Sequence, residues 1–240
     1  MNREYRSRPR DEAMEKIEWH IRKNQVKPHA KLPSERDLCE LWGLNRTTLR
    51  SAIKRLIAEG KLYNKKGSGT FVAEPKIMRN LQDSQSITEL LANKGKDFES
   101  KVLSFRLIPC TKQLSNTLHV SIGRGVYELI RLRMLDGEPL MLERTCLSED
   151  RFPELIRFDF EKESLYEVLK NHYSVMILGG NEKVGMTYAG KNEADQLNLQ
   201  EETALFYLDG VAWDEKKEPV ESFQSWVRAD RIQLFSVLKR

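Results

Sequence analysis

Two short helices separated by a tight turn constrain the fold of this chain most strongly. Ser34 follows a proline and precedes acidic residues, so it predicts the N-cap of a helix over residues 35–42. The next three residues, Gly43-Leu44-Asn45, contain a glycine that can end this helix and an asparagine that can cap a second helix over residues 46–60. A connection this short is typical of a helix-turn-helix. The segment therefore predicts that motif.

Apolar spacing and a glycine-bounded turn extend the motif in both directions. We expect a preceding helix over residues 11–24 and a following hairpin over residues 61–74, turning at Gly67-Ser68-Gly69. The hairpin would be the wing of a winged helix-turn-helix in residues 1–74. The helix side chains that we expect to face the core are Met14, Ile17, Ile21, Leu38, Leu41, Trp42, Leu49, Ala52, Ile53 and Leu56.

Charge divides the chain at about residue 80. Residues 1–80 contain 19 Lys and Arg against 10 Asp and Glu, a net charge of +9, whereas the remaining residues carry −5. A basic region beside an acidic remainder indicates that the first part meets a polyanion. The alternative is a chance distribution of surface charge.

The start of the helix over residues 46–60 carries the side chains that duplex DNA requires. Arg46 and Arg50 are four residues apart and share a helical face, where arginine can bond guanine O6 and N7 together. The alternative is a solvated helix face, but the tight turn, the hairpin and the regional charge favour DNA. The residues that we expect to contact DNA are Arg36, Arg46, Thr47, Thr48, Arg50, Lys65, Lys66, Gly67, Ser68 and Gly69.

The remainder of the chain predicts an α+β domain with an antiparallel sheet and packed helices. We expect residues 75–82 to be a linker and residues 83–240 to be the second domain. Expected strands cover residues 100–108, 126–134, 140–147, 182–188, 204–213 and 220–227. Expected helices cover residues 87–94, 112–118, 165–172 and 193–197. We expect the glycines of residues 178–181 to make a turn, the alternative being that they shape a pocket.

Two arginines two residues apart mark a candidate ligand site in the second domain. Arg131 and Arg133 lie on one face of their strand, which places their Cα atoms about 7 Å apart. If that face lines a cavity, the pair would clamp an anion, and Glu143 on the next strand would pair with one arginine or accept sugar hydroxyls. The alternative is a solvated sheet face bridged to Glu143.

Other function classes lack their sequence signatures. The four histidines and three cysteines have no metal-ligand spacing, and no phosphate-binding loop or nucleophile elbow is present. The first ten residues are polar and arginine-rich, and no apolar run reaches the ~18 residues of a membrane span. The three cysteines are odd in number and far apart, which favours a reducing compartment. We therefore expect a cytoplasmic protein with no metal and no cofactor.

The first domain resembles the GntR family of bacterial regulators. The resemblance implies that Arg36, Arg46 and Arg50 contact DNA, with Gly67 and Gly69 of the wing in the groove. One departure is Asn45, where the family usually has serine, although asparagine caps equally well. The motifs that carry the resemblance are Leu32-Pro33-Ser34-Glu35-Arg36, Asn45-Arg46-Thr47-Thr48-Leu49-Arg50-Ser51-Ala52, Gly60 and Gly67-Ser68-Gly69-Thr70-Phe71-Val72.

The second domain resembles the effector domain of the HutC subfamily, the UTRA domain, which has a chorismate-lyase-like fold. The segments that match are Ser86-Ile87-Thr88, Leu129-Ile130-Arg131-Leu132-Arg133, Pro139-Leu140-Met141-Leu142-Glu143, Ser164-Leu165-Tyr166, Val220-Glu221 and Arg228-Ala229-Asp230. Position by position, the resemblance implies that a phosphorylated sugar meets Ser86, Arg131, Arg133, Glu143, Ser164, Tyr166 and Glu221. Val227 departs from the tyrosine that is usual in sugar-phosphate sensors, so the exact effector stays open.

The combined interpretation is a homodimeric repressor of a carbohydrate-uptake or catabolic operon, released from a palindromic operator by its effector. Activation rather than repression stays open, as does a carboxylate or amino-acid-derived effector. A chorismate-lyase-like enzyme would instead turn its ligand over. A protein that only bends or packages DNA would not need an acidic domain of about 155 residues.

Overall fold

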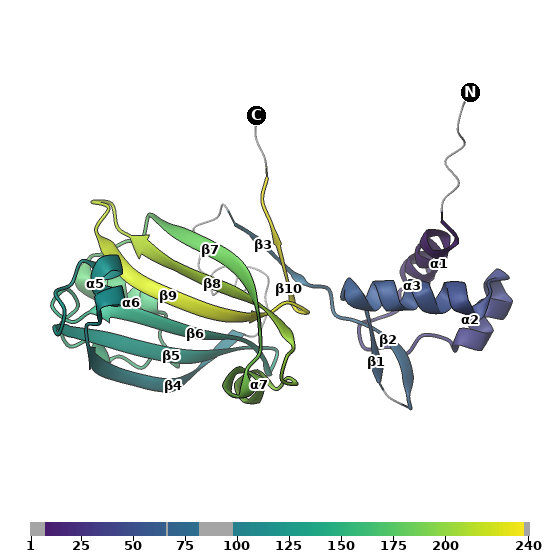
Figure 1. Cartoon of the computed structure of the whole chain (residues 1–240), viewed down its shortest axis with the longest axis horizontal. Coiled ribbons are helices and arrows are strands. Elements are labelled where there is room, and N and C mark those ends of the chain that lie inside the picture. The colour runs from purple at the N-terminus through teal and green to yellow at the C-terminus, as the bar shows by residue number, and fades with distance from the viewer. Residues whose placement is uncertain (1–7, 66, 82–97, 238–240) are drawn as a thin grey trace, which may run out of the picture. The chain divides into compact units, whose positions relative to one another are not determined.

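The computed structural model describes residues 8–65, 67–81 and 98–237 of the chain. These residues form two compact units, which divide between Ile77 and Met78 (Figure 1). The first unit contains the expected helices and hairpin. The second contains a six-stranded sheet with its helices.

The first unit consists of three helices followed by a two-stranded hairpin, as the sequence predicts. Its elements are α1 (Pro9–Lys23), α2 (Glu35–Trp42), α3 (Arg46–Ala58), β1 (Leu62–Lys65) and β2 (Gly69–Val72).

Side-chain caps define both helices of the helix-turn-helix. The Ser34 hydroxyl accepts a hydrogen bond from the Asp37 backbone N–H at 3.2 Å, and the Asp37 carboxylate accepts one from the Ser34 N–H at 3.3 Å. Gly43 ends α2 in the left-handed conformation (φ +63°), which glycine adopts without steric cost. The Asn45 side chain then accepts a bond from the Thr48 N–H at 2.7 Å. Together these groups fix the tight turn.

The apolar stripe of α3 forms the centre of the first core. Its buried side chains are Leu49, Ala52, Ile53 and Leu56. They pack with Ala13 and Ile17 of α1, Leu38 of α2 and the hairpin residues Leu62 and Val72. The prediction that Leu41 faces this core is wrong, because its side chain is 64% exposed. Leu38 and Trp42 of this two-turn helix pack against the core, whereas Leu41, between them in sequence, lies beyond the edge of that contact.

The second unit is built on an antiparallel sheet with strand order β4-β5-β6-β9-β8-β7. The strands are β4 (Phe98–Pro109), β5 (Gly125–Leu135), β6 (Glu138–Ser148), β7 (Gly179–Tyr188), β8 (Ala204–Trp213) and β9 (Pro219–Arg228). The helices are α5 (Lys112–Leu118), α6 (Leu165–Tyr173) and α7 (Lys191–Leu197), with a 3-10 turn over Leu155–Arg157. All six predicted strands and three of the predicted helices are confirmed; the helix expected over residues 87–94 lies outside the described residues.

The two faces of the sheet pack against different helices. On one face, Tyr127 and Leu129 of β5 form a core with Leu165 and Val168 of α6. On the other face, β5 and β6 pack against α5 near one end and against α7 near the other. The contacts with α5 involve Val126, Cys146, Leu114 and Leu118. The contacts with α7 involve Leu132, Leu142, Ala194 and Leu197. This alternation follows from the two-residue period of a strand. It places Arg131 and Arg133 on the α6 face.

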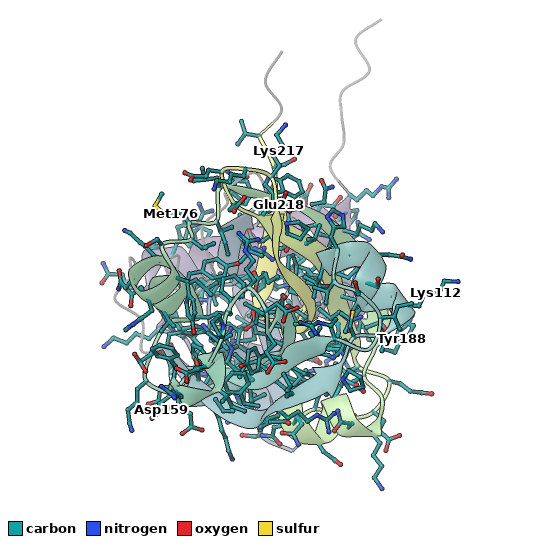
Figure 2. All side chains as sticks on the ribbon, turned by 90° about the vertical axis from the view of Figure 1, so that its left-hand side faces the viewer. Lys112, Asp159, Met176, Tyr188, Lys217 and Glu218 are labelled. Atoms are coloured by element: carbon teal, nitrogen blue, oxygen red, sulfur yellow. The ribbon has the colours of Figure 1, made fainter. Side chains whose placement is uncertain are left out.

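Strand β7 is one of the two outer strands of the sheet and pairs only with β8 among the described strands. It begins at Gly179, so the expectation of a turn at residues 178–181 is wrong. A Cβ atom at Gly180 would lie 2.8 Å from the Val211 carbonyl oxygen, so the close approach of β8 explains this glycine. Tyr188, at the other end of β7, is exposed, as are Lys217 and Glu218 in the turn between β8 and β9 (Figure 2).

A short strand, β3 (Ile77–Asn80), lies inside the segment that we expected to be a linker. It pairs with β10 (Ile232–Phe235) near the C-terminus, and the Leu81 N–H donates to the Phe235 carbonyl at 2.8 Å. This strand was not predicted from the sequence. A four-residue strand whose partner is about 150 residues away has too little local pattern to be predicted.

Replacing Leu49 with alanine should destabilise the first unit by about 2–5 kcal/mol, because the side chain is fully buried and leaves a cavity. Equilibrium urea unfolding measures the change. Leu41→Ala is the matched control, since the same substitution at an exposed position should change stability by less than about 0.5 kcal/mol. Equal losses in the two variants would contradict the described core.

Candidate functional site

The exposed side of α3 presents the first candidate site. Arg46, Thr47 and Arg50 are exposed in the first two turns, on the side opposite the buried stripe. Thr48 is half-buried, and its backbone N–H is already capped by Asn45. A capped helix start with cations and hydroxyls fits the entry of a recognition helix into a major groove.

Two of the predicted DNA-contacting arginines, Arg36 and Arg50, are held by carboxylates of α2. The Arg50 Nε donates to Glu35 Oε2 at 2.7 Å, and the Arg36 Nε donates to Glu40 Oε1 at 3.0 Å. The bond to Glu35 raises the pKa of Arg50, which therefore keeps its charge. Both guanidinium groups remain largely exposed. The carboxylates hold the guanidinium groups in place and leave their remaining N–H donors accessible to DNA.

The hairpin supplies a narrow, cationic tip. Gly67 has φ +73° and Gly69 has φ +123°, conformations that side-chain-bearing residues rarely adopt. Lys65, Ser68 and both glycines are exposed, whereas Lys66 lies outside the described residues. A glycine tip beside a lysine suits a minor groove, because it brings charge without bulk.

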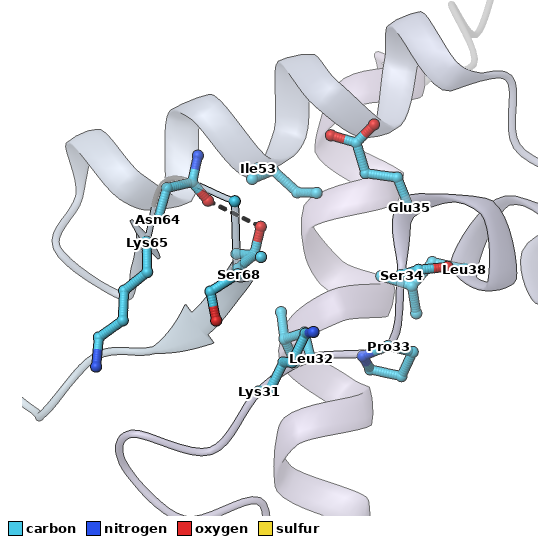
Figure 3. Close-up of a pocket in the computed structure, with 13 residues that line it drawn as sticks. Lys31, Leu32, Pro33, Ser34, Glu35, Leu38, Ile53, Asn64, Lys65 and Ser68 are labelled. Atoms are coloured by element: carbon cyan, nitrogen blue, oxygen red, sulfur yellow. Dashed lines mark hydrogen bonds between the residues drawn. The ribbon is translucent and has the colours of Figure 1, made fainter.

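A groove separates the hairpin from the start of α2 (Figure 3). Lys65 and Ser68 lie on its hairpin side, and Ser34 and Glu35 lie on its α2 side. Lys31 also lines the groove, and its Cε atom lies only 2.9 Å from where a Cβ of Gly69 would be. Lys31 was not among the predicted DNA contacts, although its place directly before Leu32-Pro33-Ser34 was an available signal.

The second candidate site is a buried cluster of charges on the α6 face of the sheet. Arg131 is 5% exposed and Arg133 is 3% exposed, which rules out the alternative of a solvated sheet face. The Arg131 Nη2 lies 2.5 Å from Glu143 Oε2, and the Arg133 Nη1 lies 3.9 Å from the same oxygen. Arg133 also lies over the ring of Phe98, 4.7 Å from its centre.

This cluster has more donors than Glu143 can satisfy. The Arg131 Nε is buried and has no hydrogen-bond partner among the residues that the structure describes. Burial lowers the pKa of Arg133 to about 10, so the group stays a cation at neutral pH. Burial also raises the pKa of Glu143, but Arg131 and Arg133 outweigh burial and lower it overall. A buried surplus of guanidinium donors is what an anionic ligand requires.

Glu221 and Tyr166 form the neighbouring part of the cluster. The Tyr166 hydroxyl donates to the Glu221 carboxylate, joining α6 to β9. Burial raises the pKa of Glu221 to about 7, and the nearby Glu143 adds to this rise. Burial and Glu221 raise the pKa of Tyr166, so its hydroxyl remains a donor. Glu221 can therefore accept a ligand hydroxyl when it is ionised.

The structure brings five of the seven predicted effector residues together: Arg131, Arg133, Glu143, Tyr166 and Glu221. Ser164 is the N-cap of α6 and does not cap the helix with its hydroxyl, which leaves that hydroxyl available. Ser86 lies outside the described residues. Val227 is buried and lies opposite Met141, which in turn lies opposite Arg133.

One further cation, which the sequence did not predict, lies near this cluster. Arg79 of β3 donates from Nη2 to Glu182 Oε1 of β7 at 2.7 Å, and its charge helps to lower the pKa of Glu143. Arg79 lies in the segment predicted to be a linker, where the sequence carries no signal for a ligand-site role. Among the described residues, no three metal-ligating side chains gather, and no helix is long and apolar enough to cross a membrane.

A winged helix-turn-helix joined to a sheet unit with a buried cationic site defines a class of protein that couples DNA binding to a ligand. Residues 9–72 match the bacterial regulatory proteins of the gntR family, and residues 93–233 match the UTRA domain. The chain belongs to this family, as the resemblance of its motifs implied. It is a DNA-binding transcription regulator of bacterial type and not an enzyme.

Individual relatives agree with this assignment. The chain is 33% identical to the HTH-type transcriptional regulator YurK of Bacillus subtilis, with 83% of each chain covered. It is 26% identical to a probable fructoselysine utilization operon transcriptional repressor of Shigella flexneri, covering 85% of this chain and 83% of that one. The crystal structure of PhnF from Mycobacterium smegmatis shares the fold, with a TM-score of 0.69 at 24% identity, covering 95% of this chain and 99% of that chain.

The high pKa of Glu221 predicts a pH dependence of stability. Because folding raises this pKa from 4.5 to about 7, the stabilisation is fully present below pH 4.5 and is lost as the pH rises through 7. The difference is on the order of 3 kcal/mol between pH 4.5 and pH 8. Urea unfolding at pH 5 and pH 8 measures it.

Glu221→Gln should remove most of this slope, because the amide cannot titrate and still accepts from Tyr166. Glu99→Gln, at an exposed glutamate of β4, should keep the wild-type slope. An unchanged slope in Glu221→Gln would show that Glu221 does not titrate in this range.

Proposed function

We propose that this chain is a cytoplasmic repressor of a carbohydrate-uptake or catabolic operon, released from a palindromic operator by a phosphorylated sugar. The observation that carries the proposal is the buried pair Arg131 and Arg133 beside Glu143, in which the Arg131 Nε has no hydrogen-bond partner among the described residues. Similarity to a probable repressor of a fructoselysine utilization operon supports a carbohydrate-linked role. The proposed domains are residues 1–74 for DNA binding, 75–82 as the connection and 83–240 for the effector.

The chemistry of the cluster favours a sugar phosphate over a simple carboxylate. The two guanidinium groups match either anion, since each can donate two parallel bonds. Glu143 and Glu221 are acceptors, however, and a carboxylate ligand alone offers them nothing to bond. A sugar presents hydroxyl donors beside its phosphate, so it would engage both halves of the site. A carboxylate or amino-acid-derived effector remains the second candidate, because Val227 replaces a polar side chain of the resembling sensors.

On the DNA side, we propose that the same residues that the sequence predicted meet the operator. They are Arg36, Arg46, Thr47, Thr48, Arg50, Lys65, Lys66, Gly67, Ser68 and Gly69. A homodimer would present two α3 helices to two operator half-sites. The effector acts by binding the low-affinity state of the dimer more tightly, and a coupling of ~1–3 kcal/mol corresponds to a ~5–150-fold loss of operator affinity.

Arg50→Ala should weaken operator binding by about 5–150-fold, the cost of losing one arginine–guanine contact. The operator is first selected from random duplex DNA by the wild-type protein, and gel shift then measures the affinity. Arg55→Ala is the matched control, because Arg55 lies in the last turn of α3, paired with Glu59. Equal affinities for Arg50→Ala and wild type would remove Arg50 from the proposed interface.

Thermal unfolding against a panel of sugar phosphates, each beside its unphosphorylated sugar, tests the effector. A ligand at ~100 times its Kd should add ~2.7 kcal/mol of stability. Urocanate and other carboxylates complete the panel. If only carboxylates raise the unfolding temperature, or if no compound does, the sugar-phosphate proposal is overturned. The proposed DNA-binding role would be unaffected.

Arg133→Ala should abolish this thermal shift and leave operator binding intact, because it removes one of the two guanidinium groups. Arg124→Ala, at an exposed arginine just before β5, should respond as the wild type does. A normal shift in Arg133→Ala would place the anion elsewhere.

A further inference from the structure

Strand β3 is the segment through which the chain enters the second unit. The division between the two units falls after Ile77, the first residue of β3. The Leu81 N–H, directly after β3, donates to the carbonyl of Phe235, the last residue of β10. Any signal that passes along the main chain from the sheet to the DNA-binding unit therefore passes through β3.

One side chain of β3 reaches the charged face of the sheet. Arg79 pairs with Glu182 of β7, and both side chains are only about one-fifth exposed (21% and 20%). The strand register places Glu182 level with Gly210, Phe223 and Thr145 on successive strands. Glu143 is two residues from Thr145 on β6, so Glu182 and Glu143 lie on the same face of the sheet.

Glu143 is influenced by three cations in the described residues: Arg131, Arg133 and Arg79. The first two are the guanidinium groups that a bound anion would occupy. An anion on both arginines competes directly with Glu143 for them. A buried carboxylate that loses its partners is strongly destabilised unless another cation replaces them. Arg79 is the remaining one of the three.

We propose that Arg79 couples effector occupancy to β3 by changing its partner from Glu182 to Glu143 when an anion occupies Arg131 and Arg133. Arg79 is then a positioning residue for regulation rather than a DNA contact. The exchange moves a side chain whose backbone belongs to β3, and so displaces the strand that leads to the DNA-binding unit. This inference rests on the proposed function, because it takes the Arg131 and Arg133 pair as the effector site.

The first test needs no effector. Arg131→Ala removes the strongest partner of Glu143 and should imitate the occupied state, so operator affinity should fall by at least about threefold. In the background of Arg79→Ala, the same Arg131→Ala substitution should change affinity by less than about twofold. Equal losses in both backgrounds would overturn the proposal. Circular dichroism checks that each variant is folded.

Because Arg131→Ala removes a buried charge and can fail to fold, a second measurement, by hydrogen exchange, leaves Arg131 in place and compares the wild type with Glu143→Gln. Glu143→Gln keeps the shape of the side chain but removes the charge that draws Arg79 away. Protection of the Leu81 amide should fall less when 50 mM inorganic phosphate is added to Glu143→Gln than when it is added to the wild type. A fall of the same size in both proteins would contradict the exchange of partners.

The third test uses the sugar phosphate that gives the largest thermal shift in the panel above. Arg79→Ala should keep that shift, yet the effector should reduce its operator affinity by less than about twofold, against ~5–150-fold for the wild type. Arg79→Lys, which keeps the charge, should restore part of the response. Met78→Ala, at a 40% exposed neighbour on β3, is the matched control and should respond normally.

The outcomes separate this inference from the proposed function. If no panel member binds the wild type, the sugar-phosphate effector fails, and the comparison of Arg131→Ala in the two backgrounds still decides the role of Arg79. If the effector binds Arg79→Ala and lowers its operator affinity as much as it does for the wild type, the proposed function is supported and the proposed role of Arg79 is overturned.

Discussion

The second unit depends on how the charges of two buried guanidinium groups are compensated inside the sheet domain. Arg131 and Arg133 are nearly fully buried, and burying a cation is costly unless partners replace its water shell. Glu143 compensates part of this charge, and the ring of Phe98 contacts Arg133. A pair of buried ions contributes little to stability compared with apolar packing of the same volume. Ligand binding gives a physical reason to have such a site here.

The two candidate sites use arginine in opposite ways. Arg36 and Arg50 lie in water, where pairing with a carboxylate costs little and is easily exchanged for a phosphate. Arg131 lies in the interior, where losing its carboxylate must be matched by an incoming charge. The first arrangement suits a polyanion that approaches from solvent. The second suits a small anion that must be selected from many.

Much of the architecture could be predicted because its signals are local. Helix caps at Ser34 and Asn45 depend on residues within three positions. In the strands, the side chains that face α6 recur every second residue. The candidate site was partly predictable for the same reason, since Arg131 and Arg133 are two apart. The pairing of β3 with β10 and the contact from Arg79 to Glu182 were not, because they join residues far apart in the chain. The prediction that Leu41 is buried failed for another reason, because spacing alone cannot tell which apolar residue of a two-turn helix is buried.

The ion pairs on α2 and α3 have a consequence for the search along the chromosome. A free cation that meets DNA displaces a condensed counterion, and this release makes non-specific binding strong in dilute salt. Arg36 and Arg50 already hold Glu40 and Glu35, so part of their charge is neutralised before DNA arrives. The affinity of the DNA-binding unit for random DNA should therefore be lower than its number of cationic side chains implies. We therefore expect faster exchange between non-specific sites and an operator occupancy that depends less on ionic strength.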